Sequence, residues 1–426
     1  MHPARPARRR SAWRQRARRA LLALGLAVAA SGAARAAPAC TAVAWPEWSA
    51  FVRHFVQPDG RVVDASTPRK MSTSEGQSYA MFFALVANDR ETFERLWRWS
   101  VANLAGGDTA QRLPAWSWGQ RDDGAWGVLD SNAASDADLW FTYALLEAGR
   151  LWRQPAYTRD AQALLALIEG REVVPLPGLG SMLLPAPEGF AQPDLWRLNP
   201  SYLPVPVLRR LAQASAKGPW NQVANNTVRV IQATTPKGYV ADWVAYRRVP
   251  GEGGALGQYE NDPVHGARGS YDAIRTYLWA GMTPAGDPAA RPLLAALSGM
   301  ATAVAATGVP PESVDVDSGQ AQGQAPFGFS AALLPYFQAR GQNDLLQGQL
   351  RRVRDAWAAS QSPARLAVQQ PPYYDYVLSL FGTVSYTHLR QGPQAGRRRA
   401  GARQPDAGRP IGRHHPPGRH QAAPAV

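Results

Sequence analysis

The sequence contains a single cysteine, Cys40, so no disulfide can form within the chain. Between residues 37 and 382 the only histidines are His54 and His265, which are too far apart to match a recognisable metal-ligand spacing. No glycine-rich phosphate loop follows a predicted strand, and no apolar run reaches the roughly 18 to 20 residues of a transmembrane helix. We therefore expect no metal, no cofactor, no nucleotide chemistry and no membrane span in the mature protein.

Basic charge is concentrated at the two ends of the chain, and the body between them has almost no net charge. The formal net charge is +14, of which residues 1–36 carry +9 and residues 390–426 carry +7, which leaves −2 for the body. A near-neutral body lacks the basic surface with which proteins bind nucleic acid. We therefore expect no nucleic-acid partner. The 15 Trp, 14 Tyr and 11 Phe predict a large buried core instead.

The first 36 residues have the pattern of a secretory signal peptide. An arginine-rich segment at 1–19 precedes an apolar run at 20–30, and Ala34 and Ala36 supply the small residues of a cleavage site. We predict that 1–36 is removed and that the mature protein resides in the periplasm or is secreted. The arginine pairs leave open whether export follows the general or the twin-arginine route.

The composition changes abruptly after Gly382. Residues 390–426 consist largely of Arg, Gly, Pro, Ala and His, which cannot bury a core, so 383–426 is predicted to be a disordered basic tail. One encoding of 384–389 resembles a transposon end used to prepare sequencing libraries, and we interpret this tail as a sequence artefact. The alternative is a genuine tail that binds an anionic polymer.

The body at 37–382 is predicted to be an all-α domain. Apolar residues at helical spacing predict helices at 45–56, 75–86, 91–104, 139–152, 157–167, 271–280, 291–305 and 329–340, and short strands are expected at 172–176, 182–184 and 239–243. Several of these helices, including 79–86 and 139–146, are apolar on nearly every side and must be buried. This pattern favours inner helices surrounded by outer ones, in a double ring whose inner helices begin on one shared face.

Three predicted helices of this kind begin with acidic residues: Glu75, Asp136 (followed by Asp138) and Asp272. Each has a local explanation. Ser72 and Glu75 match a capping box, Asp136 has the position of an N-cap, and Asp272 is spaced to pair with Arg275. Three acidic helix starts on one face nevertheless favour a carboxylate site. Grouped carboxylates raise one another's pKa, whereas the helix dipole lowers it.

At these residues the sequence resembles a known family, family 8 of the glycoside hydrolases, over about 40–382. The resemblance is strongest to the periplasmic endoglucanases that accompany the bacterial cellulose synthase complex. It rests on STSEGQSYAM at 72–81, LPAW at 113–116, LDSNAASDAD at 129–138, PGLG at 177–180, NPSYLP at 199–204 and SYDAIR at 270–275. Phe141 and Thr142 depart from the usual continuation of the 134–138 signature, but both lie beyond its acids.

This resemblance implies an (α/α)6 barrel that hydrolyses β-1,4-glucan with inversion of configuration. Inverting hydrolysis needs one protonated carboxyl at the leaving oxygen and one carboxylate that holds a water, about 6.5 to 9.5 Å apart. By their positions in the motifs, Glu75 would be the acid and Asp272 the base. Asp136 would hold or distort the sugar between them, although some descriptions of the family call this position the nucleophile. A further implied partner is the cellulose synthase machinery.

Sugar rings also require aromatic faces, because the C–H bonds of glucose stack on indole and phenol rings. The residues expected to bind glucan or support the acids are Trp116, Trp140, Asn199, Tyr202, Tyr271, Arg275 and Asp138. Two alternatives remain. A non-catalytic glucan-binding toroid would not be expected to keep all three acids, and a chitosan or xylan hydrolase would share the same fold.

Overall fold

Helices make up most of the protein. The computed structural model describes residues 45–251 and 256–390, so the predicted signal peptide and the segment beyond 390 lie outside the described residues. The helices are α2 (Pro46–Phe55), α3 (Ser74–Val86), α4 (Arg90–Asn103), α5 (Ser135–Trp152), α6 (Pro155–Arg171), the short 3-10 helix η1 (Pro200–Tyr202), α7 (Val205–Ala214), α8 (Trp220–Ala233), α9 (Ala273–Met282), α10 (Ala290–Ala296), α11 (Gly299–Thr307), α12 (Phe327–Ala339), α13 (Asn343–Ser360), α14 (Pro363–Leu366) and α15 (Tyr373–Arg390).

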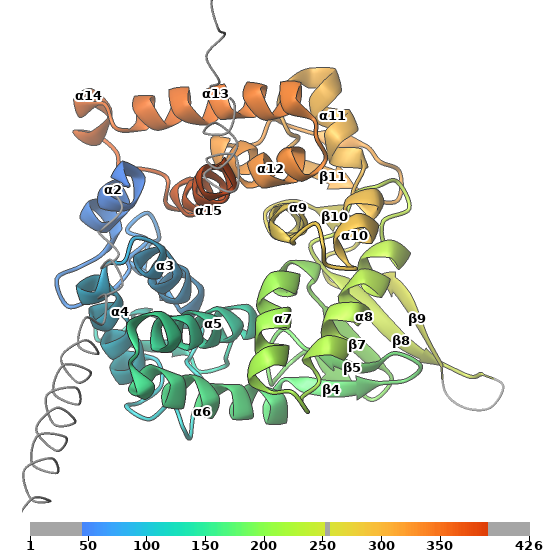
Figure 1. Cartoon of the computed structure of the whole chain (residues 1–426), viewed down its shortest axis with the longest axis horizontal. Coiled ribbons are helices and arrows are strands. Elements are labelled where there is room, and N and C mark those ends of the chain that lie inside the picture. The colour runs from blue at the N-terminus through green and yellow to red at the C-terminus, as the bar shows by residue number, and fades with distance from the viewer. Residues whose placement is uncertain (1–44, 252–255, 391–426) are drawn as a thin grey trace, which may run out of the picture.

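The helices form two concentric layers, as Figure 1 shows. In the inner layer, α3 packs on α5, α5 on α7, α7 on α9, α9 on α12, and α12 on α15. Each inner helix also has a partner in the outer layer: α4 packs on α3, α6 on α5, α8 on α7, α10 on α9, α13 on α12, and α2 on α15. Inner and outer helices therefore alternate along the chain, as the all-round apolar helices predicted.

The inner layer is closed by aromatic packing around Phe381 of α15. Its ring lies 4.7 to 5.5 Å from those of five other aromatic residues: Tyr79, Phe82 and Phe83 of α3, Trp140 of α5, and Trp279 of α9. These contacts join the last inner helix to the first. The core of the protein is therefore the centre of the ring, where the helices bury residues on every side.

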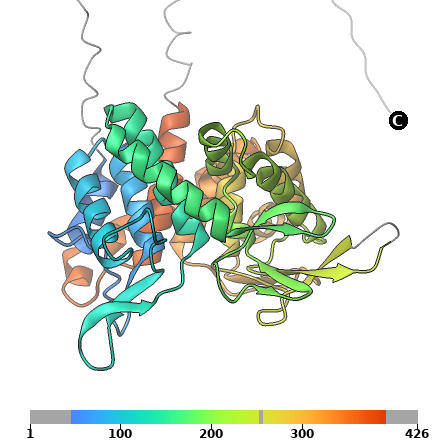
Figure 2. The same cartoon turned by 90° about the horizontal axis from the view of Figure 1, so that it is seen from below.

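Short antiparallel strands connect the helices and lie together on one side of the helical layers (Figure 2). They form four sheets, with strands β1 (Ser72–Thr73), β2 (Ser117–Gln120) and β3 (Trp126–Asp130); β4 (Val173–Leu176) and β5 (Gly180–Leu183); β6 (Ala191–Gln192), β7 (Leu195–Leu198), β8 (Val244–Val249) and β9 (Leu256–Asn261); and β10 (Arg268–Gly269), β11 (Ser313–Asp315) and β12 (Ala321–Gln322). Because β1 runs into α3 and β10 precedes α9, two inner helices begin directly at these sheets.

Most of the predicted elements are present, and two predictions were wrong. The strand expected at 239–243 is a loop, because the Asp242 carboxylate there accepts the backbone N–H groups of Ser270 and Ala273. The helix expected at 291–305 is divided into α10 and α11. The break lies next to a close approach in which the Gly299 N–H donates to the Gly238 carbonyl at 2.9 Å.

Five α-helices, α7, α8, α13, α14 and α15, and the 3-10 helix η1 were not predicted. The predicted domain boundary at Gly382 falls inside α15, which continues to Arg390, and Val384 is buried. Among the described residues, no helix is both long enough and apolar enough to cross a membrane.

Replacing Phe381 with alanine tests how far the ring depends on this closure. Phe381→Ala removes a buried ring that contacts three other helices, so we expect the free energy of unfolding to fall by roughly 3 to 5 kcal/mol. Urea denaturation provides the measurement. Leu151→Ala, at a side chain that is 53% exposed, serves as the control and should change little. A loss below about 1 kcal/mol for Phe381→Ala would show that the ring closes by other contacts.

Candidate active site

The Arg275 guanidinium brings the three predicted acids together. Its Nη1 lies 3.5 Å from Glu75 Oε1, and its Nη2 lies 3.0 Å from Asp272 Oδ1 and 4.0 Å from Asp136 Oδ2. Arg275 is buried in the first turn of α9, and the acids stand at the starts of α3, α5 and α9. The N-termini of three inner helices therefore converge at one site, as the sequence predicted.

The local capping pattern leaves these carboxyls free for the site. Thr73, rather than Ser72, caps α3 by accepting the Gly76 N–H, so the predicted capping box is wrong and the Glu75 side chain reaches Arg275. Asp136 is likewise not the N-cap of α5, because Ala134 occupies that position. The predicted pair of Asp272 with Arg275 is present.

Asp136 is the buried member of the group. Its Oδ1 accepts the Ala137 N–H at 2.8 Å, and its Oδ2 has no hydrogen-bond donor among the described residues. Burial, followed by the charge of Glu75, raises the pKa of Asp136 well above its usual value, while Arg275 and the Ala137 N–H oppose this shift. The carboxyl of Asp136 therefore depends on Arg275 for its charged form.

Glu75 and Asp272 are accessible, with 26% and 30% of their side chains exposed. Asp272 is held on both oxygens. Arg275 contacts Oδ1, while Asn199 Nδ2 donates to Oδ2 at 3.3 Å and Trp243 Nε1 donates to it at 3.1 Å. Glu75 is less constrained, because among the described residues Arg275 is its one side-chain donor, at 3.5 Å. The site thus presents one tightly oriented carboxyl and one loosely held carboxyl to solvent.

Exposed aromatic rings stand beside these acids. Trp116 is 37% exposed, and its carbonyl accepts the Ser74 N–H directly before Glu75. Tyr271 precedes Asp272, is 41% exposed, and donates its hydroxyl to Glu312 Oε1 at 2.9 Å. The ring of Tyr202 lies 5.9 Å from the Arg275 guanidinium. Trp116 and Tyr271 can therefore meet a ligand that lies across the acids, and Tyr202 lies beside the guanidinium that holds those acids.

Two predicted binding residues do not face this surface. Trp140 is buried in the core, where its ring packs against Phe82, Trp279 and Phe381. Asp138 is also fully buried, so it has no surface to offer a substrate. The prediction for both residues rested on their nearness in sequence to Asp136. Along a helix, however, neighbouring residues point in different directions.

Other residues that build the site were missed in the sequence. Asp242 accepts the N–H groups of Ser270 and Ala273 and the Ser270 hydroxyl at 2.6 to 2.7 Å, so it caps α9 from a distant loop. Trp243 follows it and donates to Asp272. Both lie in the segment 239–243, which the sequence predicted as a strand, and that pattern does not distinguish residues that support a site.

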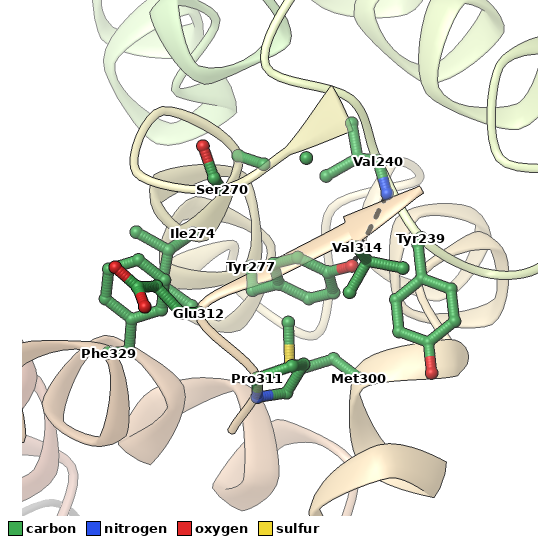
Figure 3. A pocket seen from close by; sticks show the side chains of 12 residues that line it. Tyr239, Val240, Ser270, Ile274, Tyr277, Met300, Pro311, Glu312, Val314 and Phe329 are labelled. Atoms are coloured by element: carbon green, nitrogen blue, oxygen red, sulfur yellow. Dashed lines mark hydrogen bonds between the residues drawn. The ribbon is translucent and has the colours of Figure 1, made fainter. Parts of the chain in front are cut away.

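A small pocket behind the start of α9 shows how this helix is held in place (Figure 3). Most of its lining is apolar, and Tyr277 points across it so that its hydroxyl accepts the Val240 N–H at 3.4 Å. Ser270 and Glu312 stand at its edge, whereas Glu75, Asp136 and Asp272 are not among its lining residues. We interpret it as packing that fixes Tyr271 and Asp272 from behind.

The group combines acid and base chemistry in one place. Within residues 45–251 and 256–390, no cluster of three His, Cys, Asp or Glu side chains has the arrangement of a metal site. What the arrangement offers is two accessible carboxyls on different nitrogens of one guanidinium and a third carboxyl buried beside them. Such a group can donate a proton at one position and accept one at another.

Comparisons with known proteins identify relatives along most of the chain. Residues 23–388 match the family described as glycosyl hydrolases family 8. The endoglucanase of Pseudomonas fluorescens (strain SBW25) is 50% identical over 345 residues, which are 79% of this chain and 86% of that protein. The endoglucanase of Escherichia coli (strain K12) is 45% identical over 344 residues, or 81% and 87% of the two chains. The solved endo-1,4-D-glucanase from Vibrio fischeri ES114 aligns with a TM-score of 0.71 and 38% identity, covering 81% of this chain and 95% of that one.

Removing the shared guanidinium should make stability depend on pH. In Arg275→Met the carboxyls lose their cation, so the pKa of Asp136 in the folded protein rises further above its unfolded value. A carboxyl whose pKa is higher in the folded than in the unfolded protein stabilises the fold at low pH. This contribution is lost as the pH rises through the pKa of the folded protein. We expect a loss of roughly 3 kcal/mol or more at pH 8 and a smaller loss at pH 5.

Urea denaturation at several pH values measures this difference. Arg209→Met, which removes an arginine paired with Asp287 elsewhere, is the matched control and should show no comparable pH dependence. A loss for Arg275→Met that is equal at pH 5 and pH 8 would contradict the electrostatic account.

Proposed function

Because the chain belongs to family 8 of the glycosyl hydrolases, we infer that it is an endo-β-1,4-glucanase, and we propose that it cleaves β-1,4-glucan with inversion of configuration. The observation that carries the mechanism is the contact of one buried guanidinium with two accessible carboxyls, Glu75 and Asp272. The alternating rings of helices are, in this proposal, an (α/α)6 barrel whose helix N-termini form the catalytic face.

In the proposed reaction Glu75 is the general acid and Asp272 the general base. Glu75 gives its proton to the glycosidic oxygen as the bond from that oxygen to C1 breaks. A water held by Asp272 attacks C1 from the opposite face and gives its proton to that carboxylate. The tight orientation of Asp272 by Asn199, Trp243 and Arg275 suits a group that must aim a water. The weaker hold on Glu75 suits a group that must approach the leaving oxygen.

Asp136 is proposed to act on the sugar between these two groups. Its carboxyl lies beside Arg275 and close enough to Glu75 for the charge of Glu75 to raise its pKa. An ionised carboxylate there would stabilise the positive charge that develops on the sugar ring in the transition state.

Glucan is proposed to lie across the exposed rings of Trp116 and Tyr271, with Tyr202 closer to the acids. Stacking on such rings orients a sugar while leaving its hydroxyls free for polar partners.

We further propose that the enzyme acts in the periplasm or outside the cell after removal of 1–36, and that it accompanies cellulose synthesis. Reducing-sugar release from soluble cellulose derivatives, chitosan and xylan separates the substrate classes.

Conservative amide variants test the two roles. Glu75→Gln cannot supply a proton and Asp272→Asn cannot accept one, so we expect each to lower kcat by about 10²-fold to 10⁴-fold. Binding of a cello-oligosaccharide, measured by calorimetry, should survive in both. Glu94→Gln, on the outer helix α4, is the control and should keep the activity of the parent. Activity within about tenfold of the parent in either amide variant would move that role to another residue.

The stereochemistry of the first product tests inversion separately. Attack by water on the face opposite the leaving group converts a β-linkage into an α-anomer. Proton NMR of a cello-oligosaccharide digest, recorded before mutarotation, should therefore show the α-anomer first. An initial β-anomer would replace the inverting mechanism with one in which Asp136 is the nucleophile.

A further inference from the structure

Behind Asp136 lies a second pair of carboxyls, Asp138 and Glu172, that the proposed reaction does not use. Asp138 belongs to the first turn of α5, and Glu172 follows α6 and precedes β4. Both side chains are fully buried, and all four of their carboxyl oxygens lack an N–H or O–H donor among the described residues. Ionised carboxylates only accept hydrogen bonds, so two of them buried together without donors would be strongly unfavourable.

No cation compensates this pair in the described part of the chain. The Arg275 guanidinium contacts Glu75, Asp136 and Asp272, and no ion pair reaches Asp138 or Glu172. The three acids of the site and this pair thus make five carboxyls beside one guanidinium. Buried charges need a partner, and the alternative to a cation is a proton.

The Asp138 and Glu172 side chains interact directly with each other, so that a proton on one of the two carboxyls satisfies both. Burial raises the pKa of Glu172 well above its usual value, and the charge of Asp138 and the hydrogen bond to it raise this pKa further. Burial also raises the pKa of Asp138, but there the hydrogen bond from Glu172 acts in the opposite direction. One proton held between the two carboxyls lets one of them donate to the other, and this proton belongs to the pair.

We propose that Glu172 and Asp138 share one proton, as a carboxylic acid that donates to a carboxylate, and that this pair positions Asp136 by fixing the first turn of α5. The pair joins that turn to the segment after α6, whose backbone is held in turn because the Glu172 carbonyl accepts the Leu184 N–H at 2.8 Å. Its single negative charge lies at the positive end of α5. A second charge there would act on Asp136, whose own charge already raises the pKa of Glu172.

Infrared spectroscopy of the whole protein at neutral pH tests the shared proton without reference to activity. The parent should show the C=O stretch of a protonated carboxylic acid that Glu172→Gln lacks, because the glutamine amide donates to Asp138 in its place. Glu169→Gln, in the last turn of α6 just before Glu172, is the matched control. The Glu169 carboxylate already has a donor, because it accepts the Trp220 Nε1–H at 2.7 Å. Equal protonated bands in the parent and Glu172→Gln would overturn the proposal.

The positioning role is tested by kinetics, and this part rests on the proposed glucanase function. Glu172→Gln keeps a donor and should hold kcat within about threefold of the parent, whereas Glu172→Ala leaves the buried Asp138 carboxylate unpaired and should lower kcat at least about tenfold, with a small change in KM. Asp138→Asn, which also keeps a donor within the pair, should behave like Glu172→Gln and covers the case in which Glu172→Ala does not fold.

The outcomes separate the two proposals. A kcat for Glu172→Ala equal to that of the parent would remove the positioning role, as would a loss for Asp138→Asn as large as that of Glu75→Gln. If the parent itself hydrolysed no glucan, the proposed function would fail, while the infrared comparison would still decide whether the proton is shared.

Discussion

The site depends on one buried cation that holds several carboxyls together. Arg275 contacts acids from α3, α5 and α9, and each of these acids stands at the start of an inner helix. Without a cation, carboxylates this close would repel one another. With the Arg275 guanidinium between them, the three acids can have different surroundings. Asp272 is held by three donors, Glu75 is loosely held and exposed, and Asp136 is buried. These differences are what permit separate acid, base and electrostatic roles.

The ring of helices is what makes this convergence possible. A helix can be apolar on all sides only if it is surrounded, and the inner helices are surrounded by one another and by the outer layer. Because inner and outer helices alternate along the chain, α3, α5 and α9 bring their first turns to one face. The loops and small sheets at these ends then supply Trp116, Tyr202 and Tyr271. Fold and site are therefore two consequences of the same packing.

A second layer of buried polar groups holds the acids in position. Asp242 caps α9, and Asn199 and Trp243 orient Asp272. Asp138 and Glu172 stand behind Asp136, where burial rather than a cation governs their protonation. Buried polar groups are stable only when their hydrogen bonds are satisfied, so each of these contacts restricts the geometry in front of it. The exposed carboxyls are therefore held in defined positions, because the buried groups behind them have few other ways to satisfy their hydrogen bonds.

Local pattern in the sequence determined the helical class, the inner and outer layers, and the residues that meet at the site. Helical spacing, all-round apolar segments and acidic helix starts are properties of adjacent residues, and they led to Glu75, Asp136, Asp272 and Arg275. Only the tertiary structure decided which side chains support the acids and which face a ligand. Trp140 turns into the core although it lies near the acids in sequence, whereas Asp242, Trp243 and Glu172 reach the site or its support from distant segments. Contacts between residues far apart along the chain leave no periodic pattern in it, because packing of whole helices and loops brings them together.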